Sequence, residues 1–250
     1  MGEALVSRSP LPVLIGCAIA LLAAGAAACS GLGYRWEWWD FRLGFTILRW
    51  AAWCGLAAAA VCLWGAVLAR PGTHRPGFWL ALTGIIVGVC VFWLPWQQMR
   101  TARQVPAIHD ISTDTDDPPL FSAILPLRAA AANPATYGGP EVAGKQHTAY
   151  PDIKPLRLAA APAMAFQRAL AAAHGLHWTV VAQDPAAGRI EAFDRTLWYG
   201  FTDDVVIRIT PEGDGSRIDV RSVSRVGKGD IGTNARRIRT FLGAVAQAGK

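Results

Sequence analysis

The fold of the C-terminal half is decided by the stretch Gly200–Ile238, GFTDDVVIRITPEGDGSRIDVRSVSRVGKGDIGTNARRI. Two runs in it, Val205–Thr210 and Arg217–Val226, are rich in β-branched residues and alternate in polarity, which is typical of β-strands. The turn between them, rich in Gly and Asp, predicts an antiparallel hairpin. A Gly-rich loop follows the second run, and an amphipathic helix is predicted over Thr233–Ala248.

The residues just before this stretch extend the same pattern. Ala163–His174 has apolar residues at helical spacing, between a proline suited to the first turn and a glycine suited to the helix end. His177–Gln183 and Arg189–Thr196 are two further strand-like runs. The order helix, four strands, helix predicts a two-layer α+β domain over residues 162–250, with both helices on one face of an antiparallel sheet.

Residues 97–161 form a proline-rich connector ahead of this domain. Its eight prolines argue against long helices, because proline disrupts a helix interior and restricts the residue before it. We therefore expect the connector to wrap the following domain in extended form.

The first 96 residues contain three uncharged apolar segments, Leu11–Leu32, Trp50–Ala69 and Gly77–Trp96. Each reaches the roughly 20 residues that a helix needs to span a bilayer. Residues 33–49 mix arginines and acids with tryptophans, which predicts a loop at the membrane interface. The turn Arg70–Pro76 joins the second and third segments.

None of the three segments holds an ionisable side chain, and charge inside the membrane is the usual mark of a transport pathway. We therefore expect residues 1–96 to form a three-helix transmembrane anchor and not a channel or pump. A signal peptide is the alternative interpretation of the first segment, because Ala26–Ala28 before Cys29 resemble a cleavage site.

The chain has 250 residues and a formal net charge of +6, which is spread evenly. Residues 1–96 carry six arginines against three acids, and the remainder carries 18 basic against 15 acidic residues. This thin distribution lacks a Lys/Arg block, so we expect no nucleic-acid partner. All five cysteines lie in the apolar segments, which excludes a cysteine-ligated zinc in the C-terminal domain, and we expect no cofactor.

Side chains on the strand Arg217–Val226 alternate between two faces, and Arg221 and Arg225 share one of them. One interpretation is structural, with the two arginines bridging Asp204 and Asp230 to fix the corner between strand, loop and helix. The other is an anion site, where the guanidinium groups and the loop N–H groups bind a phosphate, carboxylate or lipid headgroup. The candidate ligand-binding residues are Arg221, Ser224, Arg225, Asp230, Asn234, Arg237 and Asp204.

The connector contains a second candidate, IHDISTDTDDPP at Ile108–Pro119. Its acids and histidine are metal-ligand types, but the EF-hand and HExxH spacings are absent, and Asp, Ser and Thr also form turns. We expect turn chemistry and no metal. The alternative function is a membrane-bound hydrolase that uses His109, Asp110 and Asp114 together with the two strand arginines.

The runs DDVVIRI (Asp203–Ile209) and DVRSVSRVGKGDIGTNARRI (Asp219–Ile238) resemble the RSxSRxGxxDxGxNxxRI core of a bacterial and plastid family, the domain of unknown function fourteen ninety-nine. The resemblance covers His109 to Leu242, and the HDISTD start is similar to the family's membrane-anchored branch. It implies no established activity, and leader-bearing members imply a domain outside the cytoplasm. The positions that it marks are Arg221, Ser222, Ser224, Arg225, Gly227, Asp230, Gly232, Asn234 and Arg237.

Two arguments about orientation disagree. The Lys/Arg count beside the spans, three against five, narrowly favours a cytoplasmic C-terminal domain, whereas the family resemblance implies a periplasmic one. We predict a bacterial inner-membrane protein with a cytoplasmic N-terminus and a periplasmic C-terminal domain. We expect a binding or structural envelope module and not an enzyme. Its expected partners are the lipid bilayer and an anionic lipid, glycan or envelope protein, and its oligomeric state is not specified.

Overall fold

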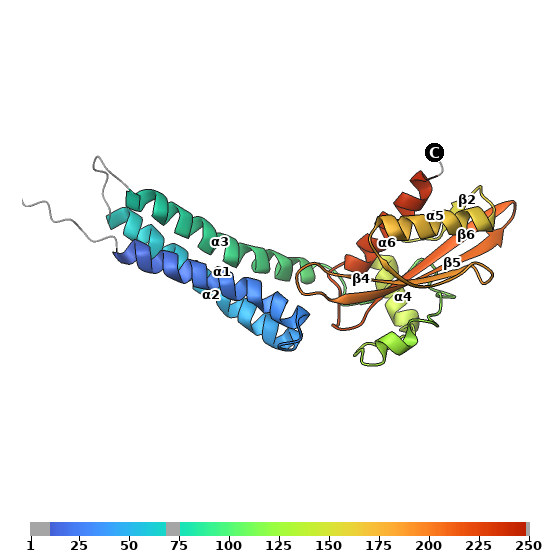
Figure 1. Cartoon of the computed structure of the whole chain (residues 1–250), viewed down its shortest axis with the longest axis horizontal. Coiled ribbons are helices and arrows are strands. Elements are labelled where there is room, and N and C mark those ends of the chain that lie inside the picture. Colours follow the sequence, from blue (N-terminus) through green and yellow to red (C-terminus); the bar gives the residue numbers. More distant parts are fainter. Residues whose placement is uncertain (1–10, 69–75, 249–250) are drawn as a thin grey trace, which may run out of the picture. The chain divides into compact units, whose positions relative to one another are not determined.

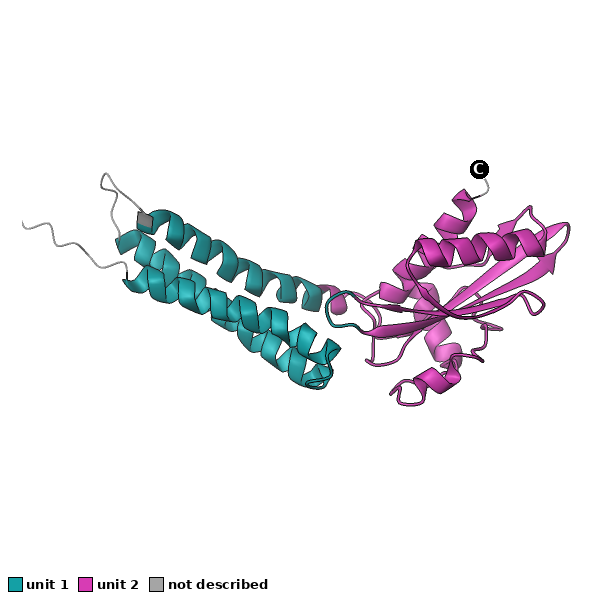
Figure 2. Cartoon of the chain, in the orientation of Figure 1, with its two compact units in different colours: residues 1–100, 197–200 teal, residues 101–196, 201–250 magenta. Residues whose placement is uncertain are grey.

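The computed structural model describes residues 11–68 and 76–248. The chain divides into two compact units (Figure 2). The first comprises residues 1–100 and 197–200, and the second comprises residues 101–196 and 201–250. The turn predicted at Arg70–Pro76 lies, apart from its last residue, outside the described residues.

The first unit is built from three long helices, α1 (Leu11–Arg35), α2 (Phe41–Leu68) and α3 (Pro76–Ala102) (Figure 1). Each of them is long and apolar enough to cross a membrane, which confirms the three predicted apolar helices. We therefore treat this unit as membrane-associated.

The loop between α1 and α2 is shorter than the sequence predicts. Of residues 33–49, only residues 36–40 lie outside the helices. The carboxylate of Asp40 accepts hydrogen bonds from the backbone N–H groups of Arg42 and Leu43. This capping starts α2 early, because it satisfies amides that have no partner within the helix.

Small residues let the helices of the first unit approach closely. A Cβ on Gly88 in α3 would lie 2.4 Å from the carbonyl oxygen of Gly55 in α2. A Cβ on Gly84 would lie 2.4 Å from the sulfur of Cys62. Such close contact is how helices associate in a bilayer, where van der Waals packing takes the place of the hydrophobic effect.

The second unit contains a six-stranded antiparallel sheet. The strand order is β1-β6-β5-β4-β3, and β2 also pairs with β6. The four predicted strands are present, and two short strands from the connector extend the sheet. The bounds are β1 Asp110–Ser112, β2 Leu156–Leu158, β3 Thr179–Asp184, β4 Arg189–Arg195, β5 Thr202–Glu212 and β6 Gly215–Ser224.

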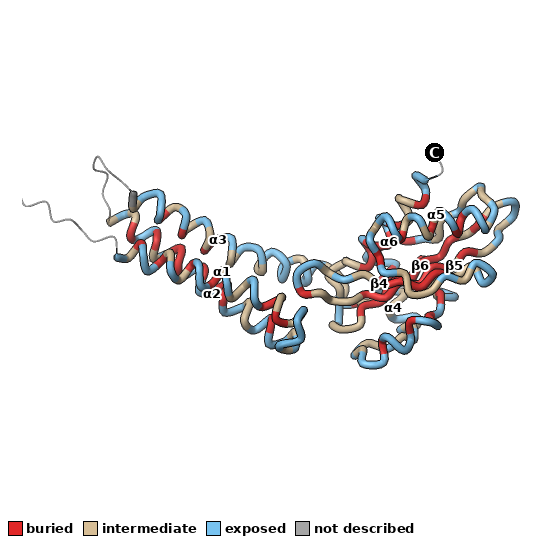
Figure 3. Tube along the Cα trace, in the orientation of Figure 1, coloured by how far each residue is buried: buried red, intermediate tan, exposed pale blue. Residues whose placement is uncertain are grey.

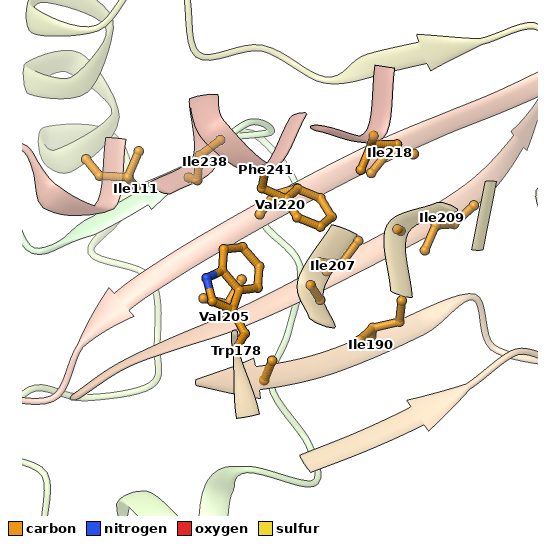
Figure 4. Close-up of a cluster of buried hydrophobic side chains, with 14 of the residues drawn as sticks. Ile111, Trp178, Ile190, Val205, Ile207, Ile209, Ile218, Val220, Ile238 and Phe241 are labelled. Atoms are coloured by element: carbon orange, nitrogen blue, oxygen red, sulfur yellow. The ribbon is translucent and has the colours of Figure 1, made fainter. Parts of the chain in front are cut away.

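Helices α5 (Pro162–Gly175) and α6 (Thr233–Gln247) pack on one face of this sheet, as predicted (Figure 1). The core between them consists of aliphatic side chains from the strands with Phe166, Trp178 and Phe241 (Figure 4). The rings of Trp178 and Phe241 stack with centroids 5.1 Å apart. Burial is concentrated in the central strands β5 and β6 (Figure 3).

The connector is not wholly extended. It forms a short 3₁₀ helix, η1 (Leu125–Arg128), and the α-helix α4 (Gly139–Ala149). Proline density argued against long helices, but Pro140 occupies the first turn of α4, where proline is tolerated. The side-chain amide of Gln146 in α4 accepts a hydrogen bond from the N–H of Ser112 and donates one to its carbonyl oxygen. Gln146 thereby covers the edge of β1, as a neighbouring strand would.

Candidate functional site

The two faces of β6 carry different polar networks. The register places Asp219, Arg221 and Val223 on one face, together with Asp204 of β5. We call this the connector face, because residues 110–135 cover it. The other face, which packs on α6, carries Ser222 and Ser224.

Arg221 is the largest fully buried side chain of the connector face. Its Nε and Nη2 donate to the two carboxylate oxygens of Asp110 at 2.9 and 2.7 Å. Nη1 and Nη2 also donate to the carbonyl oxygens of Pro119 and Ala135. The guanidinium group therefore has a protein partner on each of its nitrogens, and it ties the connector to the middle of the sheet.

Asp204 lies between two arginines on the same face. Arg225 donates to its carboxylate from Nε and Nη2, the latter at 2.7 Å, and Arg128 of η1 approaches from the connector. Arg225 also donates to the carbonyl oxygen of Leu127. Burial lowers the pKa of Arg128, although the charge of Asp204 partly offsets this effect. The carboxylate of Asp204 thus holds the middle of the connector against the sheet.

A third cluster on the connector face joins Asp114 and Asp219 to two arginines. Arg208 and Arg217 each form ion pairs with both carboxylates, at 2.7 to 3.2 Å. Oδ1 of Asp114 also accepts the N–H groups of residues 116 and 117, which is the turn chemistry expected for this segment.

Glu191 on β4 is a fully buried carboxylate that the sequence did not single out for this role. It accepts backbone N–H groups from Ser122, Ala123 and Ile124 at 3.0 to 3.1 Å, and Arg189 forms an ion pair with it. The polarity of neighbouring residues does not reveal this role, since a solvated strand carboxylate has the same local sequence.

The face of the sheet under α6 holds the second network. Arg237 donates to Asp194 on β4 and to Asp203 on β5, at 2.9 and 2.7 Å. The same side chain donates to Asn234 Oδ1, which also accepts the hydroxyl of Ser222. Burial raises the pKa of Asp203, while Arg237 opposes the shift.

Asp230 closes the loop in front of α6. Its two carboxylate oxygens accept the N–H groups of Gly232 at 2.9 Å and Asn234 at 2.5 Å. Burial raises the pKa of this carboxyl, although these two hydrogen bonds lower it in part. Ile231 has φ 54° and Gly232 has φ 74°, so a β-branched residue is held in the left-handed region beside the cap.

A buried hydroxyl without a partner faces the same loop. Tyr150 is 7% exposed, and its hydroxyl has no hydrogen-bond partner among the residues that the structure describes. The oxygen lies 3.3 Å from the position that a Cβ on Gly232 would occupy. Burial and the charge of Asp230 raise the pKa of Tyr150, while Arg239 and Arg236 lower it.

The structure brings the predicted site residues together only in part. Arg225 pairs with Asp204 as the structural interpretation expected, but Arg221 pairs with Asp110, and Asp230 caps a helix. Ser224, Asn234 and Arg237 lie in the network under α6.

The secondary candidates of the connector have separate partners. Asp110 pairs with Arg221, and Asp114 pairs with Arg208 and Arg217. His109 contributes its backbone carbonyl, which accepts bonds from Ser224 and Asn234. Among residues 11–68 and 76–248, no group of three or more His, Cys, Asp or Glu side chains has an arrangement that could hold a metal ion.

These features define a chain with three membrane-length helices and an α+β domain held together by an internal ion-pair lattice. Residues 110–245 match the family model described as a protein of unknown function, DUF1499. The match covers more than half of the chain, so the chain belongs to this family, as its motif predicted. No curated protein matches the sequence.

Proposed function

We propose that the chain is a membrane-anchored binding module of the bacterial envelope, and that it holds an anionic group at residues 227–233. We call this segment the α6 entry loop. The observation that carries the proposal is the buried Tyr150 hydroxyl beside Gly232, which has no partner among the described residues. An unmet buried polar group costs about 1–3 kcal/mol, and a ligand oxygen would remove that cost.

The charge around the loop favours an anion. Lys228 is an exposed cation within the loop, and Arg236 is exposed in the first turn of α6. Arg236 is near enough to lower the pKa of Tyr150, so its charge acts at the position of the unpartnered hydroxyl. The positive end of the α6 dipole adds to this field, which suits a phosphate or carboxylate.

Asp230 sets the pH dependence of the proposed site. Its carboxylate repels an anion, and it already occupies the N–H groups of Gly232 and Asn234. Because burial raises its pKa, Asp230 becomes neutral at a higher pH than an exposed aspartate does. Anion binding should therefore strengthen as pH falls through the pKa of Asp230.

The arginines of the sequence-predicted anion site have a different part in this proposal. Arg221 and Arg225 supply the frame, because their nitrogens donate to Asp110, Asp204 and connector carbonyls. The ligand would be held by exposed cations at the edge of that frame. A module of this kind binds without catalysis, which is the non-enzymatic role that we propose.

The experiment uses the full chain in phosphatidylcholine nanodiscs, titrated with inorganic phosphate against chloride at equal ionic strength. A ligand that binds the folded state raises the free energy of unfolding, by about 2.7 kcal/mol at 100 times its Kd, and the unfolding midpoint rises with it. We expect phosphate to stabilise the wild type and not the Lys228→Ala/Arg236→Ala variant. The charge-matched control Lys145→Ala/Arg195→Ala alters exposed cations elsewhere and should keep the response.

Tyr150→Phe separates the ligand bond from the fold. Without phosphate it should unfold no more easily than the wild type, because it removes an unpartnered hydroxyl. With phosphate it should gain less stability than the wild type. Equal phosphate responses in the wild type, Tyr150→Phe and the double cation variant would refute the site.

A second arm identifies the source of the anion. Nanodiscs that contain phosphatidylglycerol should stabilise the chain without added phosphate if the group is a lipid headgroup. If only free phosphate stabilises it, the ligand is a soluble anion. We also propose that the membrane is the bacterial inner membrane and that the domain lies in the periplasm, as the leader-bearing members of the family support.

A further inference from the structure

The first unit includes a segment that is remote in sequence from its helices, residues 197–200. Leu197 is 89% exposed and Trp198 is 41% exposed. Trp36 and Trp38, which follow α1, are 54% and 65% exposed. These side chains belong to a unit whose three helices are long and apolar enough to cross a membrane, so an apolar environment suits them.

The segment is held firmly, because its contacts with the helices are specific. The indole Nε1 of Trp198 donates to the carbonyl oxygen of Ala28 at 3.1 Å. Its ring occupies the space above Gly31, where a Cβ would lie 2.5 Å from the indole. Arg35 donates to the carbonyl oxygen of Leu197. The exposed side chains are thus displayed from a fixed backbone.

Tyr199 fastens the other side of the segment. It is buried, and its hydroxyl lies 3.2 Å from that of Ser30. Its ring packs 5.1 Å from the ring of Phe45 in α2. Gly44 leaves room for this ring, since a Cβ there would lie 3.2 Å from it. Tyr199 and Trp198 thus both hold the segment against the helices, while Leu197 stays 89% exposed and Trp198 stays 41% exposed.

The position of these contacts along α1 sets their depth. A helix rises 1.5 Å per residue, so Ala28 and Gly31 lie about 26 and 30 Å from Leu11, where the apolar segment begins. The hydrocarbon core of a bilayer is about 30 Å thick. Trp198 therefore touches α1 where the hydrocarbon ends, and Arg35, the first charge after Leu11, follows one turn later.

We infer that residues 197–200 are a membrane-interface segment, with Leu197 and Trp198 placed among the glycerol and upper acyl groups of phospholipids. Tryptophan is enriched at this depth because its ring is apolar while its N–H is polar, and an arginine on the water side pairs with phosphates. The assignment is continuous with the lipid-facing surface of α1 and α2. It adds a fourth element, remote in sequence, to the three membrane-length helices.

The experiment replaces Leu197 with an environment-sensitive fluorescent amino acid by amber suppression, in the full chain in phosphatidylcholine nanodiscs. Because Leu197 is 89% exposed, the replacement leaves the packing intact. Leu120, which is 72% exposed in the second unit, is the matched control position. Quenching is compared between aqueous iodide and lipids that carry a nitroxide at the top of the acyl chain.

We expect the Leu197 probe to be blue-shifted, protected from iodide and quenched by the nitroxide lipid, with the reverse at Leu120. Iodide quenching of the Leu197 probe without nitroxide quenching would overturn the inference, because it would show a solvated loop. Quenching by neither agent would also overturn it, because the probe would then face protein. Equal nitroxide quenching at both positions would also overturn it, because the contact would then be general adsorption of the chain.

Discussion

The ion pair between Arg221 and Asp110 should be the costliest single connection of the domain to break. Arg221→Ala leaves Asp110, whose side chain is 5% exposed, as an uncompensated buried charge. Breaking a buried pair in this way costs about 3–5 kcal/mol. The carbonyl oxygens of Pro119 and Ala135 lose a donor as well. A domain's total stability is about 5–15 kcal/mol, so the loss is a large share of it.

The assay is pulse proteolysis in urea on the full chain in nanodiscs, which reports the folded fraction of the domain. Arg221→Lys keeps the charge but loses the two-pronged geometry, so it should fall between the wild type and Arg221→Ala. Arg236→Ala removes an exposed arginine and should change stability by no more than about 0.5 kcal/mol.

A double-mutant cycle with Asp110→Asn isolates the pair. The double variant should cost at least about 1 kcal/mol less than the sum of the single variants, because each single change leaves the other partner buried alone. A cost below about 1 kcal/mol for Arg221→Ala, or strict additivity with Asp110→Asn, would refute a structural role for this ion pair. Arg221 would then be available to bind a ligand.

Three further outcomes follow from the same geometry. Glu191→Gln should destabilise the domain by about 1–3 kcal/mol in the same urea assay. A neutral amide cannot accept the three backbone N–H groups and pair with Arg189 as the carboxylate does. An unchanged urea midpoint would contradict this prediction. The pKa values of Asp203 and Asp230 are raised, which means that the native state holds their protons more tightly than the unfolded state does. Their contribution to stability is therefore full below about pH 4, which is the pKa of an aspartate in the unfolded chain. That contribution is lost as pH rises through the pKa values of the folded state. Asp230→Asn should flatten part of that decline in midpoints measured from pH 4 upward, and an identical slope would contradict it. A reporter fused after Lys250 that is active only in the periplasm should give a signal, whereas a signal from the cytoplasmic counterpart alone would uphold the positive-inside count instead.

Local patterns were enough to predict the long elements. The apolar lengths of the spans, the alternation of β5 and β6 and the amphipathic stripe of α6 are set by near neighbours in the chain. Apart from the pair between Arg225 and Asp204, the partners of the charges were not predictable in this way. Arg221 meets a carboxylate 111 residues earlier, and Glu191 meets amides 67 to 69 residues earlier. Which acid an arginine meets depends on how the connector crosses the sheet, and the connector's own residues carry no periodic signal for that path.

The RSVSR part of the family motif lies mostly on one strand, β6, and its residues alternate between the two faces of the sheet. In RSVSR, residues 221, 223 and 225 point to the connector, and residues 222 and 224 point to α6. A single ligand cannot be held on one side by Arg221 and Arg225 together with Asn234 and Arg237, because the sheet separates the two sets. The motif residues instead form ion pairs on both faces of the sheet. Arg221 and Arg225 pair with Asp110 and Asp204 on the connector face. Arg237 of α6 pairs with Asp194 and Asp203 on the other face. Both sets of ion pairs end where β6 gives way to the α6 entry loop, where Lys228 is exposed and the unpartnered hydroxyl of Tyr150 lies beside Gly232. If binding is the function, the motif's internal pairs position that loop, and their variants should lose binding only in proportion to the folding that they lose.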